Sequence, residues 1–412
     1  MQAERHEKSL ERMRVIADQC PLPVNRNFYL FGLDTTTQSR PFANTLEDRG
    51  FQHSPNPAPG NRPITVGHAY SVLAALPEKQ GAMPPPWIIP LLVQRVPSDQ
   101  KSTDIGADQV MDILTDDKLN FGSHLCVLTG DSTYSSRSFL GQTGSHENLV
   151  AVVRVRGNRV FYDQHQPTQE PAGKGHPVWF GNPFDLKNPS AQREPDLNEV
   201  LNITLGNGRE CCVSINGWEN MLMRGTRYIP MHKYPFTLIR IMVKDMDGKD
   251  VFKKPLWLII IGRCRNEISI SDAYHAYRQR YDMEHFFRFG KTKLLMASYQ
   301  TPIVEHEENW WEIVAIAYVN LYTAVPIAKD LPYPWERWHP KYKEADDQRL
   351  PSPSAVQRDM PRIINAFGTP AKSPKPRGKS PGRQKGQFQV RRMSLPVVKK
   401  GKNEPEIHAQ AA

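Results

Sequence analysis

The stretch NFYLFGLDTTT, residues 27–37, is expected to form a strand. Aromatic and branched residues run directly into Asp34, as in a buried strand that ends on a carboxylate. Two more strands are expected at 63–76 and 87–96, then an amphipathic helix at 104–119 and a short buried strand, 124–131, that ends on Asp131. This order predicts an α/β fold in which helices cover both faces of a mixed sheet.

The second half of the chain alternates between β-rich and helical stretches. The spacing of apolar residues and of turn signals predicts a strand at 148–162 with a turn at Gly157-Asn158, a loop at 163–195, short strands within 200–262, a strong helix at 271–295 and a largely apolar helix at 309–328. Order is expected to fade from about residue 330 into a Pro-rich linker and a tail.

The net charge of +10 is concentrated in the tail. Segment 371–402 carries 11 of the 53 Lys and Arg residues and no acidic residue, so the rest of the chain is nearly neutral. A basic tail rich in Pro, Gly and Ser is typical of a disordered segment that binds polyanions. A solubilising tail with weak, nonspecific affinity for nucleic acid is the alternative.

Cysteine usage and hydropathy exclude several classes of protein. Five scattered cysteines without a C-x-x-C pair indicate a reduced cytosolic protein without a zinc knuckle. The longest apolar run, LWLIIIG at 256–262, is far shorter than the roughly 18 residues that span a membrane. The charged start of the chain is not a secretory signal.

Two aspartates follow similar strand ends, FGLD at Asp34 and LTGD at Asp131. A carboxylate at the end of a strand is rigidly held yet open to water on one side, which suits a metal ligand. Each aspartate could instead cap the turn that follows it.

The predicted helix at 271–295 carries a phenol, a guanidinium, a carboxylate and an ammonium in line. A helix turns by about 100° per residue, so Tyr277, Arg280, Glu284 and Lys291 fall within an arc of about 60°. Apolar residues of the same helix point broadly toward a core: Met283, Phe286 and Phe289. A solvated face with i,i+4 ion pairs is the alternative. Together with two strand-end aspartates, however, Glu284 makes a hard-oxygen site suited to Mg²⁺ or Mn²⁺.

The spacing Tyr277-x2-Arg280-x3-Glu284-x6-Lys291 resembles the Tyr–Arg–Glu–Lys signature of bacterial insertion-sequence DDE transposases. In that group a β-rich domain interrupts an RNase H-like core, and the 153-residue gap from Asp131 to Glu284 resembles this insertion. The resemblance covers about residues 28–328. It implies a short N-terminal segment (1–27), an RNase H-like core in two parts (28–162 and 256–330), a β-rich insertion (163–255), and a Pro-rich linker with a disordered basic tail (331–412).

The resemblance also implies roles for individual residues. Asp34, Asp131 and Glu284 would bind two Mg²⁺ ions, for which Mn²⁺ could substitute, about 4 Å apart as in two-metal phosphodiester chemistry. Arg280 and Lys291 would grip DNA phosphates, and Tyr277 would support the same contact.

More distant residues complete the predicted DNA site. Arg154 and Arg159, in RVRGNRVFY, could line a DNA channel, with Arg154 and Arg156 on one face of their strand. Trp257 could stack on an extruded base or belong to the core. His285 and the EHEE run at 305–308 are expected to be a surface histidine and a solvated helix start.

The implied function is DNA transposition in the bacterial cytoplasm at the nucleoid, by a homodimer that holds transposon ends and target DNA, with no membrane association. Relatives usually carry a helical DNA-binding domain before the first aspartate, whereas only 33 residues precede Asp34. The alternatives are therefore an N-terminally shortened, inactive DNA-binding remnant and an RNase H-like nuclease with a host role. A metal-free structural protein would leave the three carboxylates and the signature spacing unexplained.

Overall fold

The computed structural model describes residues 2–54, 63–79, 84–165, 178–205, 208–331, 335, 350–366, 368, 378, 382, 384–388 and 392–399. Most of the basic segment 371–402 lies outside these residues, so the predicted disorder of the tail falls largely outside the described part of the chain.

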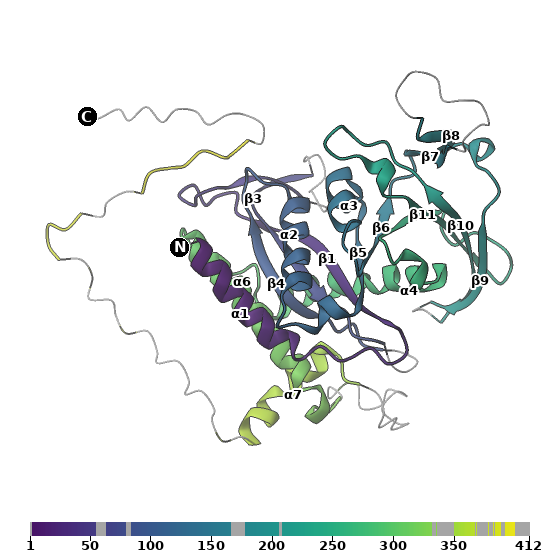
Figure 1. Cartoon of the computed structure of the whole chain (residues 1–412). Coiled ribbons are helices and arrows are strands. Elements are labelled where there is room, and N and C mark those ends of the chain that lie inside the picture. Colours follow the sequence, from purple (N-terminus) through teal and green to yellow (C-terminus); the bar gives the residue numbers. More distant parts are fainter. Residues whose placement is uncertain are drawn as a thin grey trace.

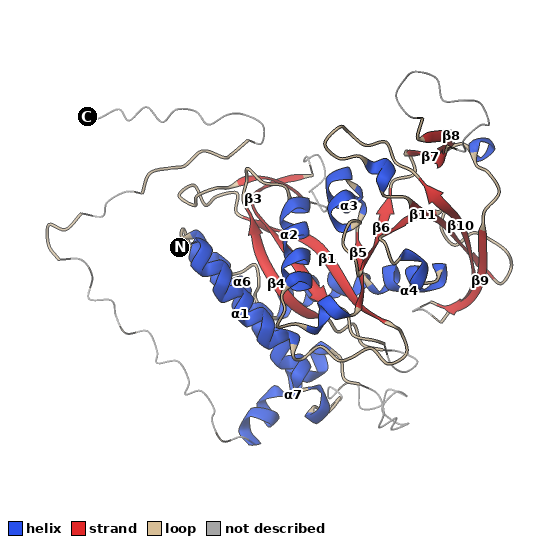
Figure 2. Ribbon diagram, viewed as in Figure 1, coloured by secondary structure: helices blue, strands red, loops and turns tan. Residues whose placement is uncertain are grey.

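A single ten-stranded sheet organises the molecule, in the order β2-β3-β1-β5-β6-β12-β11-β10-β9, with β4 also paired to β3 (Figures 1 and 2). Its strands are β1 (Phe28–Ser39), β2 (Gly50–His53), β3 (Ile64–Ala75), β4 (Ile89–Val96), β5 (Leu125–Gly130), β6 (Leu149–Val155), β9 (Leu197–Thr204), β10 (Glu210–Met221), β11 (Phe236–Asp245) and β12 (Leu256–Ile261). A separate two-stranded sheet pairs β7 (Val160–Gln164) with β8 (Phe180–Asp185).

The sheet is mixed, as predicted. Strand β1 pairs antiparallel with β3 and parallel with β5, and β5 pairs parallel with β6. Three antiparallel strands followed by two parallel ones, with helices on both faces, make the predicted RNase H-like mixed sheet. The strands β9, β10 and β11, which fall within the predicted insertion, continue this same sheet through β12.

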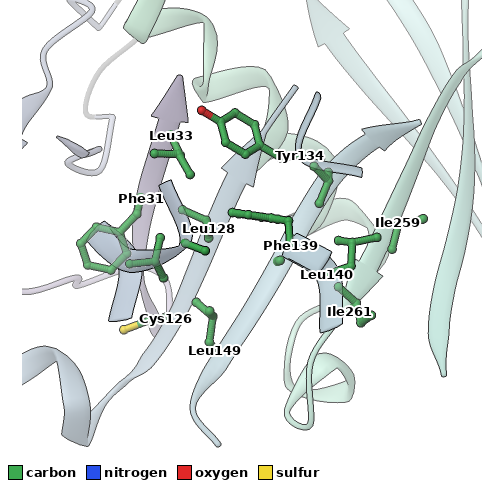
Figure 3. Packing of buried hydrophobic residues seen from close by; sticks show 14 of the residues in the cluster. Phe31, Leu33, Cys126, Leu128, Tyr134, Phe139, Leu140, Leu149, Ile259 and Ile261 are labelled. Atoms are coloured by element: carbon green, nitrogen blue, oxygen red, sulfur yellow. The ribbon is translucent and has the colours of Figure 1, made fainter. Parts of the chain in front are cut away.

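Helices flank the sheet because both of its faces are apolar. They are α1 (Gln2–Ala17), α2 (Ser102–Thr115), α3 (Arg137–Thr143), α4 (Ile270–Gln279), α5 (Tyr281–Lys293), α6 (Val304–Thr323) and α7 (Pro353–Ala366). Alternate residues of β1 enter opposite cores. Phe31 and Leu33 face the core that α2 and α3 cover (Figure 3), whereas Phe28 and Leu30 face the core that α4, α5 and α6 cover. None of the described helices is long and apolar enough to cross a membrane.

Three elements differ from the sequence prediction. The helix expected over 271–295 is divided at Arg280, which ends α4 and precedes α5 while keeping right-handed helical dihedrals (φ −50°, ψ −29°). Strand β8 lies where only loop was expected. Helix α7 lies within the expected linker, because buried Ala355, Val356 and Ile363 give it an apolar face.

The EHEE run is not wholly solvated, because Glu307 is fully buried. Arg40 Nε donates to Glu307 Oε2 at 3.1 Å, the Tyr70 hydroxyl donates to Oε1 at 2.9 Å, and His68 Nδ1 lies 2.7 Å from Oε1. Burial raises the pKa of Glu307, but hydrogen bonds from His68 and Tyr70 and the charge of Arg40 outweigh it and lower the pKa overall. The ion pair ties α6 to β3 and to the end of β1.

Replacing Glu307 by Gln should destabilise the fold by about 3–5 kcal/mol, because Arg40 would remain buried without a counter-charge. Glu305→Gln, an exposed change in the same turn, should shift stability by less than about 0.5 kcal/mol. The lowered pKa also means that the contribution of Glu307 is present above the ordinary carboxyl range and is lost as the pH falls through the folded pKa. Chemical denaturation of both variants at neutral pH measures the difference, and equal losses would contradict the assignment.

Candidate active site

The register of the parallel pair β1 and β5 brings the two aspartates together. The last paired residues are Leu33 and Gly130, so Asp34 and Asp131 each follow the final rung of the pairing. The expectation that Asp34 ends its strand is wrong, because β1 continues to Ser39 against β3, with Asp34 opposite Val72. Asp34 instead marks the point at which β1 loses its parallel neighbour.

Asp131 leaves β5 and begins a short 3₁₀ turn, η2 (Ser132–Ser135). Its carboxylate accepts the Thr133 backbone N–H at 2.8 Å and the Thr133 hydroxyl at 3.3 Å. It thus caps the next turn, as the alternative interpretation held, and this cap fixes the carboxylate beside Asp34.

Arg280 joins Asp34 to Glu284. Its Nη1 donates to Asp34 Oδ2 at 3.0 Å and its Nη2 donates to Glu284 Oε1 at 3.1 Å. The Arg280 side chain is 12% exposed and that of Glu284 is 44% exposed. The junction of α4 and α5 therefore holds one guanidinium between a strand carboxylate and a helix carboxylate.

Asp34 responds to all three of these charged neighbours. Burial raises the pKa of its carboxyl to about 6, the charge of Arg280 and the Thr35 N–H oppose this rise, and the charges of Asp131 and Glu284 add to it. The three acids thus form one electrostatic unit. Such perturbed carboxyls cluster at functional sites.

The chemistry of the three carboxylates fits a divalent hard cation. In the described part of the chain, however, no three His, Cys, Asp or Glu side chains are close enough together to hold a metal ion. The guanidinium of Arg280 binds one oxygen of Asp34 and one oxygen of Glu284.

Lys291 and Tyr277 frame the same edge of β1. Lys291 Nζ donates to the Thr36 hydroxyl at 2.6 Å and to the Thr37 carbonyl at 3.2 Å, and burial lowers its pKa. The Tyr277 ring centroid lies 5.6 Å from the Arg280 guanidinium carbon. Burial raises the pKa of Tyr277, while the charges of Arg280 and Arg154 lower it.

The predicted outer residues divide between surface and core. Arg154 is exposed on β6, and its charge lowers the pKa of Tyr277. Arg159 is half-buried, and its backbone N–H closes the turn after β6 by donating to the Arg156 carbonyl. Trp257 is 3% exposed and packs 5.6 Å from Trp218, centroid to centroid. Trp257 therefore takes the core position that was the alternative, and its ring is not available to a base.

Two residues near the site were missed in the sequence. Asp282 is buried on α5 and accepts from Lys79 Nζ at 2.9 Å. Tyr134 is fully buried beneath the carboxylates, and its hydroxyl lies 3.0 Å from the Thr35 hydroxyl, beside Leu33 in Figure 3. The position of Tyr134 three residues after Asp131, in DSTYSS, was the available signal for it.

Comparison with known families covers the part of the chain that carries the two aspartates. Residues 5–207 match the family model of DDE superfamily endonucleases. This range includes Asp34 and Asp131, and the match supports a DDE transposase-like family with nuclease or transposase activity on DNA. Enzymes of this superfamily generally use divalent metals. A search of curated proteins found no match to the chain.

The raised pKa of Asp34 predicts the sign of a pH effect on stability. The folded protein holds the Asp34 proton up to about pH 6, above the ordinary value of 3.8, so stability falls as the pH rises through this window. Asp34→Asn removes this titration, and the melting temperature of the variant relative to wild type should be higher at pH 8 than at pH 4.

Asp359→Asn is the control, because its titration lies outside this pH window. A hydrogen bond from Arg362 lowers the pKa of Asp359 below its ordinary value of 3.8, so its contribution is lost only below that pH and the change should cost nearly the same stability at pH 8 and at pH 4. Melting curves in chelator measure both variants. The same pH trend in the two would contradict the environment assigned to Asp34.

Proposed function

We propose that the chain is a metal-dependent DNA transposase that cleaves and joins strands at insertion-sequence ends. The observation that carries the proposal is the contact of Arg280 with both Asp34 and Glu284, next to Asp131. This contact joins the signature helix to Asp34, and the family match covers Asp34 and Asp131.

Asp34, Asp131 and Glu284 would hold the cations, which we expect to be two Mg²⁺ ions, with Mn²⁺ able to substitute. The cations would supply Lewis-acid stabilisation of the charge that develops on the phosphodiester. Arg280 can exchange a carboxylate for a phosphate bidentately, and Arg154 extends the positive surface beyond Tyr277. Lys291 holds α5 on β1 and keeps Glu284 beside Asp34.

The DNA partner in this proposal is double-stranded: two transposon ends and a target. Synapsis of two ends requires two active sites and hence a homodimer on DNA. Such a protein would act at the bacterial nucleoid.

One observation favours a second function. Arg280 occupies oxygens of two of the three carboxylates, an arrangement that would also suit a remnant that binds DNA without cleaving it. Catalysis therefore has to be measured directly.

Nicking of supercoiled plasmid in Mg²⁺ or Mn²⁺ tests the proposed catalysis. Wild type should nick, and Glu284→Gln should lose about 10³-fold or more of the rate, because the amide cannot replace a carboxylate ligand. Glu305→Gln, an exposed control on α6, should nick like wild type. Joining of a 3′-hydroxyl oligonucleotide to plasmid then separates a transposase from a nuclease. Equal nicking by wild type and Glu284→Gln would remove Glu284 from the site, and DNA binding without nicking would favour the remnant.

The role of Arg280 predicts a metal-binding result that needs no DNA. Because its guanidinium competes with a cation for carboxylate oxygens, Arg280→Gln should tighten Mn²⁺ binding about tenfold, equivalent to about 1.4 kcal/mol. Lys187→Gln removes a positive charge from an exposed position outside the site and should leave Mn²⁺ affinity unchanged. Electron paramagnetic resonance of free Mn²⁺ gives both affinities. Weaker binding by Arg280→Gln would mean that Arg280 assembles the metal site and does not compete for it.

A further inference from the structure

A cavity of about 290 Å³ lies where α5 meets α6 and the start of α7. Its walls are His285, Arg288, Phe289, Thr292 and Lys293 from α5, Tyr318 from α6, Pro86, and Ser352, Pro353 and Ser354 at the start of α7. None of the three proposed metal ligands is among these lining residues. The cavity is therefore a feature separate from the catalytic carboxylates.

The titratable groups in the wall are basic. Arg288 and Lys293 are exposed, and neither forms an ion pair with another described residue. Burial lowers the pKa of His285, and the charges of Arg288 and Lys79 lower it further, so two cations lie near the imidazole. No acidic side chain of the described chain lines the cavity.

The start of α7 adds donors to the same wall. The Ser352 hydroxyl accepts the Ala355 N–H at 3.3 Å. Ser354, which also lines the cavity, lies in the first turn of α7, where a backbone N–H has no intrahelical partner. The positive end of the α7 helix dipole favours an anion there. Arg288, Lys293, His285 and the start of α7 thus line the same cavity.

The remaining wall is apolar. Phe289 and Tyr318 are buried, and the Tyr318 hydroxyl donates to the Pro86 carbonyl at 3.4 Å. The volume is close to the lower limit of about 300 Å³ for small-molecule sites, which leaves room for a phosphate with part of an attached sugar. A cationic wall facing an apolar one suits a phosphodiester better than a bare inorganic anion.

The position of the cavity on α5 links it to the catalytic edge. Arg288 follows Glu284 by four residues, so the two lie about 40° apart on the helix and about 6 Å apart along its axis. Glu284 faces β1, whereas Arg288 begins the flank that carries His285 and Thr292. A strand that leaves the carboxylates across α5 would meet Arg288 next.

We propose that this cavity binds a backbone phosphate of the DNA strand that passes the catalytic carboxylates, through Arg288, Lys293, His285 and the start of α7. The phosphate chemistry of the site stands on its own residues, and only DNA as the source of the phosphate rests on the proposed function.

DNA binding tests the proposal first, with wild type compared with Arg288→Gln/Lys293→Gln. Fluorescence anisotropy with a labelled duplex, in chelator and over a series of salt concentrations, should show weaker binding by the double variant. Its log affinity against log salt should be shallower by about 1, the value for one lost phosphate contact. Lys118→Gln/Lys187→Gln removes the same charge from exposed positions outside the cavity and should keep the wild-type slope. Equal slopes for wild type and both double variants would overturn the proposal.

A second measurement separates the two sources of phosphate. The His285 ring resonance, assigned by comparison with His285→Gln, is followed by NMR during titration with inorganic phosphate or with the duplex. The resonance should shift with micromolar duplex, and inorganic phosphate should produce the shift only at millimolar concentration. Saturation by submillimolar phosphate with no response to DNA would overturn the DNA source, and no response to either ligand would overturn the site. Both outcomes are independent of nicking, so they remain distinct from failure of the proposed catalysis.

Discussion

The parallel pairing of β1 with β5 is the constraint on which the site depends. Because Leu33 lies opposite Gly130, two aspartates 97 positions apart in the chain emerge side by side. Helix α5 can then lie close over β1 because residue 32 is glycine: a Cβ there would stand only 3.0 Å from the Met283 side chain. Close approach of α5 brings Glu284 and Arg280 to Asp34, and Lys291 fastens the far end of the helix to Thr36.

The charges of the three carboxylates and of Arg280 determine which ligands this site can bind. Three carboxylates in one place repel one another, and the partly buried guanidinium of Arg280 offsets that repulsion. A bound cation would replace Arg280 in neutralising the carboxylates. Arg280 would then be free to bind a DNA phosphate. Metal and DNA binding would therefore be coupled through Arg280, and each should favour the other.

Local sequence patterns predicted most of the helices and strands. The features that they did not predict depend on packing between residues far apart in the chain. Strand and helix periodicities are local properties of the sequence. They therefore predicted the strands that lead to Asp34 and Asp131 and the helix that carries the signature residues. The sequence around Trp257 gave no such signal, because a Trp in an apolar strand could either stack on a DNA base or belong to the core. Its packing against Trp218 shows that it belongs to the core. Glu307 looked solvated among charged neighbours because its buried partners, Arg40 and His68, are more than 200 positions away.

Hydroxyl-radical cleavage by Fe²⁺ bound in place of Mg²⁺ would locate the metal on the chain without requiring DNA or turnover. The backbone should be cut near Asp34, Asp131 and Glu284 together, excess Mg²⁺ should suppress all three cuts, and Glu284→Gln should weaken all three. Cuts confined to one of these positions, or cuts elsewhere that Mg²⁺ suppresses, would show that the three carboxylates do not share a metal site.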